Sequence, residues 1–173
     1  MGDLSLILHH LKQPEYLHVV LNHWPVEGLA AGAFALAWGL LAKSKEGRRG
    51  ALCWLVLMGV MSWVAIHFGE KGYDRVYAMS NGDAQAWLDL HVARAERFEG
   101  LFTLTTFSAL AALAASWKRP VWEKRVSWLT LFFSIASFAA SGWIAQAGGQ
   151  IRHSEFRDAP PSVATPHPPN EKR

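Results

Sequence analysis

The sequence predicts an all-α integral membrane protein, a four-helix bundle whose two termini lie on the same, outer (periplasmic) side. Three observations predict this class. Apolar residues gather in four runs, each about as long as a helix that crosses a bilayer. Basic residues crowd the first and third connections between these runs. Tryptophans flank the runs, as they do in the aromatic belts of membrane proteins.

The four apolar runs define the expected spans. A soluble bundle would carry charged residues on its wet face at every turn, whereas residues 103–116 offer only hydroxyl groups. The predicted spans cover residues 24–42, 51–69, 98–117 and 126–147.

Segments on either side of these spans complete the predicted organisation. Residues 22–156 form the transmembrane domain, and residues 1–21 form an N-terminal interfacial segment because the apolar stretch 4–11 is too short to span. The proline-rich tail 157–173 is expected to be disordered. No convincing internal repeat is evident in the sequence.

Charge placement predicts the topology. Short loops rich in Lys and Arg stay in the cytoplasm. The first and third connections carry such residues: Lys43, Lys45, Arg48, Arg49, Lys118, Arg119, Lys124 and Arg125. The outer loop and helix, residues 70–97, mix basic and acidic residues. We therefore expect a multi-pass protein of a bacterial inner membrane, with both termini outside.

Two local patterns refine the helices. Residues 80–83 form a turn signal, and Asp83 is expected to cap a helix that runs without a break into the third span. Gly28 and Gly32 form a G-x-x-x-G pattern, which lets transmembrane helices approach closely.

Several function classes are disfavoured. The basic residues act as topological signals rather than as a groove-binding patch, so no nucleic-acid partner is expected. Cys53 is the only cysteine, which excludes an intramolecular disulfide and a four-cysteine metal or iron–sulfur site. A soluble enzyme is disfavoured, and the chain is not expected to be an enzyme by itself.

Histidines mark the outer end of every span. The residues are His23, His67, His91 and His153. At about 1.5 Å of rise per residue, His23 and His67 lie about 28 and 24 Å above the inner ends of their spans. His91 and His153 lie about 39 and 40 Å up, so the histidines form two layers. His9, His10 and His18 are assigned to a surface segment and are not expected to be ligands.

Carboxylates join the lower of these two layers. Glu27, Glu70 and Glu99 lie about 22 to 32 Å above the inner ends of their spans, with Glu96 and Gln146 at similar heights. Ionisable residues in membrane spans face the bundle interior or water, and they are functional candidates. Glu27 is the deepest and the most costly to leave unpaired.

This constellation is compatible with two kinds of cofactor. A b-type haem needs two axial histidines at equal depth on facing helices, and each layer offers such a pair. A transition-metal site for Fe, Cu or Zn would use His23 and His67 with one or two of Glu27, Glu70 and Glu99. The paired Glu-x-x-His motifs of di-iron bundles are absent. Alternatively the histidines lie among lipid headgroups, bond to a neighbouring helix, or relay protons.

The motifs resemble an uncharacterised bacterial membrane family, domain of unknown function 2231. The resemblance covers about residues 17–156 and consists of NHWP at 22–25, a glycine-bounded span at 59–69 followed by acids, His91, and GGQIRH at 148–153. Trp24, Glu27 and Ser154 depart from the family pattern. The resemblance implies a four-span inner-membrane protein and no established activity.

Taken together, the sequence favours a small bacterial inner-membrane protein whose outer His/Glu cluster binds haem or a transition metal, for electron transfer or metal handling. Its expected partners are the lipid bilayer and a periplasmic or membrane electron-transfer protein. One alternative is a cofactor-free accessory or structural subunit that docks a partner at its outer face. A weaker alternative is a proton-coupled transporter, for which four spans would have to form a homodimer.

Overall fold

The chain folds into helices connected by short turns. The structure, a computed structural model, describes residues 3–157, apart from the side chains at positions 118 and 120. Its elements are α1 (Asp3–His10), α2 (Pro14–Leu41), α3 (Lys45–Ala78), α4 (Gly82–Lys118), α5 (Pro120–Arg152) and the 3₁₀ turn η1 (Ser154–Phe156). Of the predicted disordered tail, all but Arg157 lies outside the described residues.

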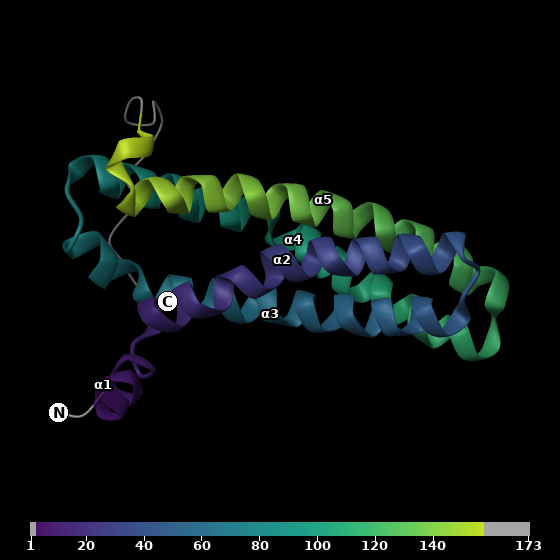
Figure 1. The fold of residues 1–173 in the computed structure, drawn as a ribbon. Coiled ribbons are helices and arrows are strands. Elements are labelled where there is room, and N and C mark those ends of the chain that lie inside the picture. The colour runs from purple at the N-terminus through teal and green to yellow at the C-terminus, as the bar shows by residue number, and fades with distance from the viewer. Residues whose placement is uncertain (1–2, 158–173) are drawn as a thin grey trace.

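Helices α2 to α5 form the predicted four-helix bundle (Figure 1). Each contains a stretch long and apolar enough to cross a membrane. Helix α2 packs along α3 and α4 packs along α5, while contacts of α3 with α4 and of α2 with α5 close the ring. The all-helical architecture is therefore confirmed, and the four apolar helices have the length and composition of a multi-pass membrane protein.

The bundle has two ends that differ in chemistry. We call the end where α2 and α4 begin and α3 and α5 finish the terminal end. The opposite end, where residues 42–44 join α2 to α3 and Arg119 joins α4 to α5, is the hairpin end. Helix α1 stands off the bundle at the terminal end (Figure 1) and buries none of its residues.

Small side chains let the helices pack closely. A Cβ added at Gly28 would lie 2.0 Å from Met58 Sδ, and one at Gly32 would lie 2.6 Å from Leu55. The G-x-x-x-G prediction of a close helix approach is thereby confirmed. Helix α5 presents buried hydroxyl residues at alternating intervals of three and four: Ser127, Thr130, Ser134, Ser137 and Ser141. Small residues at this spacing fill a helix–helix seam.

Two helix starts differ from the prediction. Helix α2 begins at Pro14, so residues 14–21 belong to the bundle rather than to an interfacial segment. Proline suits the first helical position because its fixed φ fits and its missing N–H would have no partner there. Helix α4 runs unbroken, as predicted, but Asn81 caps it instead of Asp83: the Asn81 side chain accepts a hydrogen bond from Ala84 N at 3.0 Å.

Polar residues at the hairpin end are used to join helices. Arg48 donates from Nε and Nη2 to the two carboxylate oxygens of Glu123, at 2.7 and 3.0 Å, which joins α3 to α5. Arg49 donates to the hydroxyl and the carbonyl of Ser116 at 3.0 and 3.1 Å, which joins α3 to α4. These arginines therefore stabilise the fold by joining α3 to two other helices.

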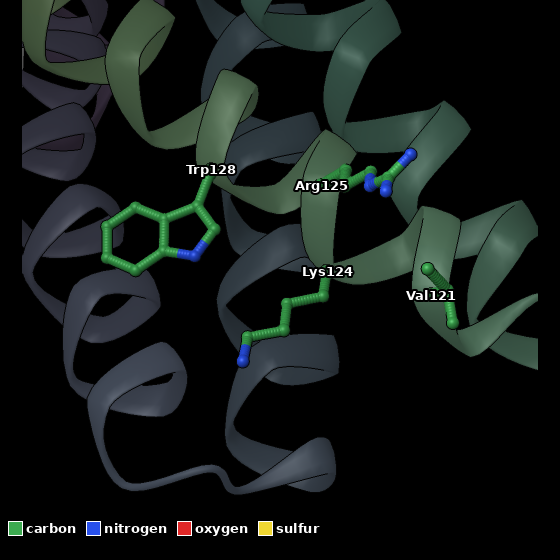
Figure 2. Close-up of a pocket in the computed structure, with 4 residues that line it drawn as sticks. All are labelled: Val121, Lys124, Arg125 and Trp128. Carbon is green, nitrogen blue, oxygen red and sulfur yellow. The ribbon is translucent and has the colours of Figure 1, made fainter.

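An open groove of about 450 Å³ runs along the first turns of α5 at the hairpin end (Figure 2). Its lining residues share one face of the helix: Val121, Lys124, Arg125 and Trp128. The Arg125 guanidinium also lies 5.5 Å from the Trp122 ring centre. Cationic groups beside exposed indole rings are typical of a membrane–water boundary.

Candidate functional site

The predicted lower layer of histidines and carboxylates is not gathered inside the bundle. His23 and His67 are exposed, as are Glu27, Glu70 and Glu99. His23 Nδ1 bonds to the carbonyl of Val19 in its own helix at 3.1 Å. Within residues 3–157, no three His, Cys, Asp or Glu side chains come close enough to hold a metal ion.

His153 lies at the end of α5 and is exposed. Its Nδ1 lies 2.9 Å from Glu155 Oε1, and its ring stacks on Phe156 with ring centres 5.0 Å apart. The hydrogen bond from His153 lowers the pKa of the Glu155 carboxyl below its ordinary value. The described contacts of His153 are thus local ones, and they do not include its predicted partner His91.

His91 is paired with a different histidine, His18. Their ring centres lie 6.0 Å apart, and the ring planes are nearly perpendicular at 80°. The surface assignment of His18 was therefore wrong, because the helix beginning at Pro14 carries this residue into the bundle. Height is the one sequence signal that points to it: His18 lies about 36 Å above Ala42, near the roughly 39 Å estimated for His91, although His153 matches that height as well.

Each of these two rings is held by a backbone carbonyl of a neighbouring helix. His18 Nδ1 lies 2.8 Å from Ala65 O on α3, and His91 Nδ1 lies 2.9 Å from Ile144 O on α5. A carbonyl only accepts, so Nδ1 carries the proton in both rings and Nε2 has the free lone pair of the neutral imidazole. Metal-bound histidines are commonly oriented by a bond of this kind on their second nitrogen.

A glycine makes room for each ring one turn beyond that carbonyl. A Cβ at Gly69 would lie 2.8 Å from His18 Nδ1, and one at Gly148 would lie 3.1 Å from His91 Nδ1. In both cases the glycine follows the accepting residue, Ala65 or Ile144, by four positions. The two hairpins therefore carry the same histidine–carbonyl–glycine unit.

The correspondence between the hairpins extends into the core. Leu29 follows His18 by the same interval as Phe102 follows His91, and both leucine and phenylalanine are buried. Leu52 precedes Ala65 by the same interval as Leu131 precedes Ile144, and both leucines are buried. The α2–α3 and α4–α5 hairpins thus repeat one structural unit, which their dissimilar residues conceal in the sequence.

Four buried polar atoms in the described part of the chain have no hydrogen-bond partner, and all lie near this pair in the sequence. They are Asn22 Oδ1, Trp87 Nε1, Arg94 Nε and Gln150 Oε1. Each belongs to a residue within about one helical turn of His18, His91 or Gly148. Buried polar groups are almost always satisfied, so these four atoms are open to a hydrogen bond from a water or a ligand.

Neighbouring bonds fix the helices around the histidines. Tyr73 donates to Asp89 at 2.5 Å, which ties α3 to α4 two residues before His91. Arg94 Nη1 donates to Trp143 O at 2.6 Å and to Gln146 Oε1 at 2.8 Å, and its guanidinium lies 4.3 Å from the Trp143 ring centre. Interhelical hydrogen bonds therefore hold the helices around the pair, while four buried polar atoms on α2, α4 and α5 have no partner in the described structure.

Comparison with known proteins adds nothing to this geometry: no family model, curated protein or solved structure matches the sequence. The resemblance to domain of unknown function 2231 stays a prediction. The His18–His91 pair and its surroundings are therefore the features that bear on function.

Proposed function

We propose that this membrane protein binds a b-type haem between His18 and His91 at the terminal end of its bundle and uses the haem for electron transfer. The observation that carries the proposal is the pair itself. Two imidazoles from different hairpins lie with their ring centres 6.0 Å apart, each with Nδ1 held by a carbonyl and Nε2 left for a ligand. This pair replaces His23, His67 and His153 as the axial ligands.

The spacing of the rings suits two axial ligands. An imidazole nitrogen lies about 2 Å from the first-row metal it binds, and the ring centre lies roughly 1 Å behind that nitrogen. Two rings on opposite sides of one metal therefore have centres about 6 Å apart. The centres of His18 and His91 are separated by 6.0 Å.

A haem also fits the number of protein ligands. A metal ion held only by protein needs three or four side chains, and residues 3–157 bring no such group together. A porphyrin supplies its own four nitrogens, so two histidines suffice. The unpartnered donors Trp87 Nε1 and Arg94 Nε lie on the same helix as His91 and would serve haem propionates.

The proposed orientation puts this site on the periplasmic side of a bacterial inner membrane. Short basic segments stay in the cytoplasm, and the hairpin end carries Lys43, Lys45, Lys124 and Arg125. The terminal end, with the histidine pair, then faces outward. Electron exchange with a periplasmic or membrane redox protein would take place there.

Visible spectroscopy tests the proposal. The chain is expressed in cells supplied with haem precursor, purified in mild detergent, and scanned oxidised and reduced. We expect a Soret band that is lost in both His18→Ala and His91→Ala but retained in the matched variants His23→Ala and His153→Ala. A colourless protein that also fails to take up added haem would refute the proposal and leave the cofactor-free accessory subunit as the better explanation.

A further inference from the structure

A second candidate site lies on the outside of the bundle, along the middle of α2. It is a groove of about 360 Å³ between α2 and α3, within the roughly 300–1,000 Å³ that small-molecule sites occupy. Its lining residues are His23, Trp24, Glu27, Gly28, Ala31 and Trp54. None of them belongs to the histidine pair.

The groove contains a carboxylate at an unusual depth. Glu27 lies about 22 Å above Ala42, inside a hydrocarbon core about 30 Å thick. Its side chain is exposed on the outer surface of an apolar helix and has no partner among the described residues. An ionisable group in such a position costs at least roughly 2.5 kcal/mol near mid-bilayer and less toward the boundary, which makes Glu27 a candidate functional group.

The other residues that line the groove are two tryptophans and two residues with small side chains. Trp24 is 56% exposed and Trp54 is 39% exposed. The Trp54 indole N–H already donates to Gly28 O at 2.8 Å, so its ring is left to make apolar contact. Gly28 and Ala31 also line the groove, and their small side chains leave it open. The groove therefore combines flat apolar walls with two hydrogen-bonding groups, His23 and Glu27, and opens toward lipid.

We infer that this groove binds the ring of a lipid-soluble quinol. A quinol ring fits between indole faces, its hydroxyl groups donate to the Glu27 carboxylate and the His23 imidazole, and its apolar tail stays in the bilayer. A phospholipid phosphate would be repelled by the carboxylate. A headgroup ammonium would have to leave the polar surface to reach the depth of Glu27, whereas an uncharged ring would not.

The groove and the histidine pair share helix α2 without sharing side chains. His23 follows His18 by five residues, which is about 7.5 Å along the helix and roughly 140° around it. His18 therefore faces the bundle while His23 faces outward. Binding in the groove does not require haem, so this proposal and the proposed function can fail separately.

Photoaffinity labelling of the full chain in mild detergent tests the inference. The probe is a short-chain azidoquinol kept reduced under anaerobic conditions, and labelled peptides are mapped by mass spectrometry. We expect labelling at residues 23–31 and near Trp54, saturable by unlabelled decylubiquinol. Glu27→Gln and His23→Leu should each weaken binding by about tenfold, while the matched variant Glu99→Gln leaves it unchanged.

Three outcomes would overturn the inference. The first is labelling elsewhere, and the second is an equal loss in Glu99→Gln. The third is displacement of the probe by phosphatidylethanolamine vesicles with the same dependence on Glu27, which would identify a lipid headgroup as the ligand. Variant folding is checked by circular dichroism, and labelling of haem-free His18→Ala protein keeps the result independent of the haem proposal.

Discussion

The two ends of the bundle differ in how far their polar side chains are hydrogen-bonded. At the hairpin end, Arg48 and Arg49 are fully engaged by Glu123 and Ser116, and these bonds join three helices. At the terminal end, four buried polar atoms lack partners in the described structure, and the Nε2 atoms of His18 and His91 are free there as well. The difference indicates that polar groups serve stability at one end and ligand binding at the other.

The largest expected effect is at the hairpin end. Glu123→Ala leaves the Arg48 guanidinium, which is 12% exposed, without its counter-charge and should lower the free energy of unfolding by about 3 kcal/mol. Thermal denaturation in detergent measures the loss. The double variant Arg48→Met with Glu123→Leu should recover most of it, and haem binding should be unaffected in every variant that folds. A Glu123→Ala protein as stable as wild type would break the contrast between the ends.

Crowding the histidine rings should have the next largest effect. Gly69→Ala puts a methyl group 2.8 Å from His18 Nδ1 and should cost about 1–3 kcal/mol, with a smaller cost for Gly148→Ala. Both changes should also shift the haem spectrum. Gly142→Ala is the control, since its added Cβ meets nothing within 4 Å, and it should stabilise the helix by up to about 1 kcal/mol. Identical behaviour of all three variants would argue against tight seating of the rings.

Removing the unpartnered indole N–H of Trp87 should weaken haem binding without lowering the stability of the haem-free protein. Trp87→Phe deletes a buried N–H that has no acceptor in the described structure, so haem-free stability should be unchanged or rise by about 1 kcal/mol. Haem retention during dialysis should fall, because a propionate loses its donor. Trp128→Phe, on the exposed groove at the hairpin end, provides the comparison. Equal haem retention in the two variants would remove Trp87 from the site.

The smallest effect is expected for Ser116→Ala. Arg49 loses a hydroxyl acceptor at 3.0 Å but keeps the backbone carbonyl of the same residue at 3.1 Å. The expected cost is about 1 kcal/mol, measured by the same denaturation assay. A loss as large as that of Glu123→Ala would mean that the hydroxyl, rather than the buried ion pair, holds the hairpin end together.

The sequence predicted the helices better than the site because of what each depends on. The length of an apolar run alone identifies a spanning helix. The spacing of Gly28 and Gly32 alone predicts that another helix packs closely against α2. Counting residues gives the height of a side chain but not the direction in which it points. His67 shares its height with His23, yet Ala65 and Gly69 face α2 while His67, between them, points outward.

The direction of His18 depended on where its helix begins. A start at residue 22 leaves His18 in a surface segment, whereas the proline start at Pro14 carries it into the bundle opposite His91. The equivalence of Gly69 and Gly148 also becomes apparent only when the contacts of the two hairpins are compared. Partner choice and unsatisfied buried atoms are properties of packing, and no single-sequence pattern encodes them.

Chemical rescue of a cavity is the most direct measurement of the central claim. His18→Gly and His91→Gly each remove one proposed axial ligand, and free imidazole can enter the space that is left. We predict that both variants lose the six-coordinate haem spectrum of the wild type and regain it when imidazole is added, with one haem per chain. Wild-type spectra from both variants without imidazole would contradict ligation by this pair.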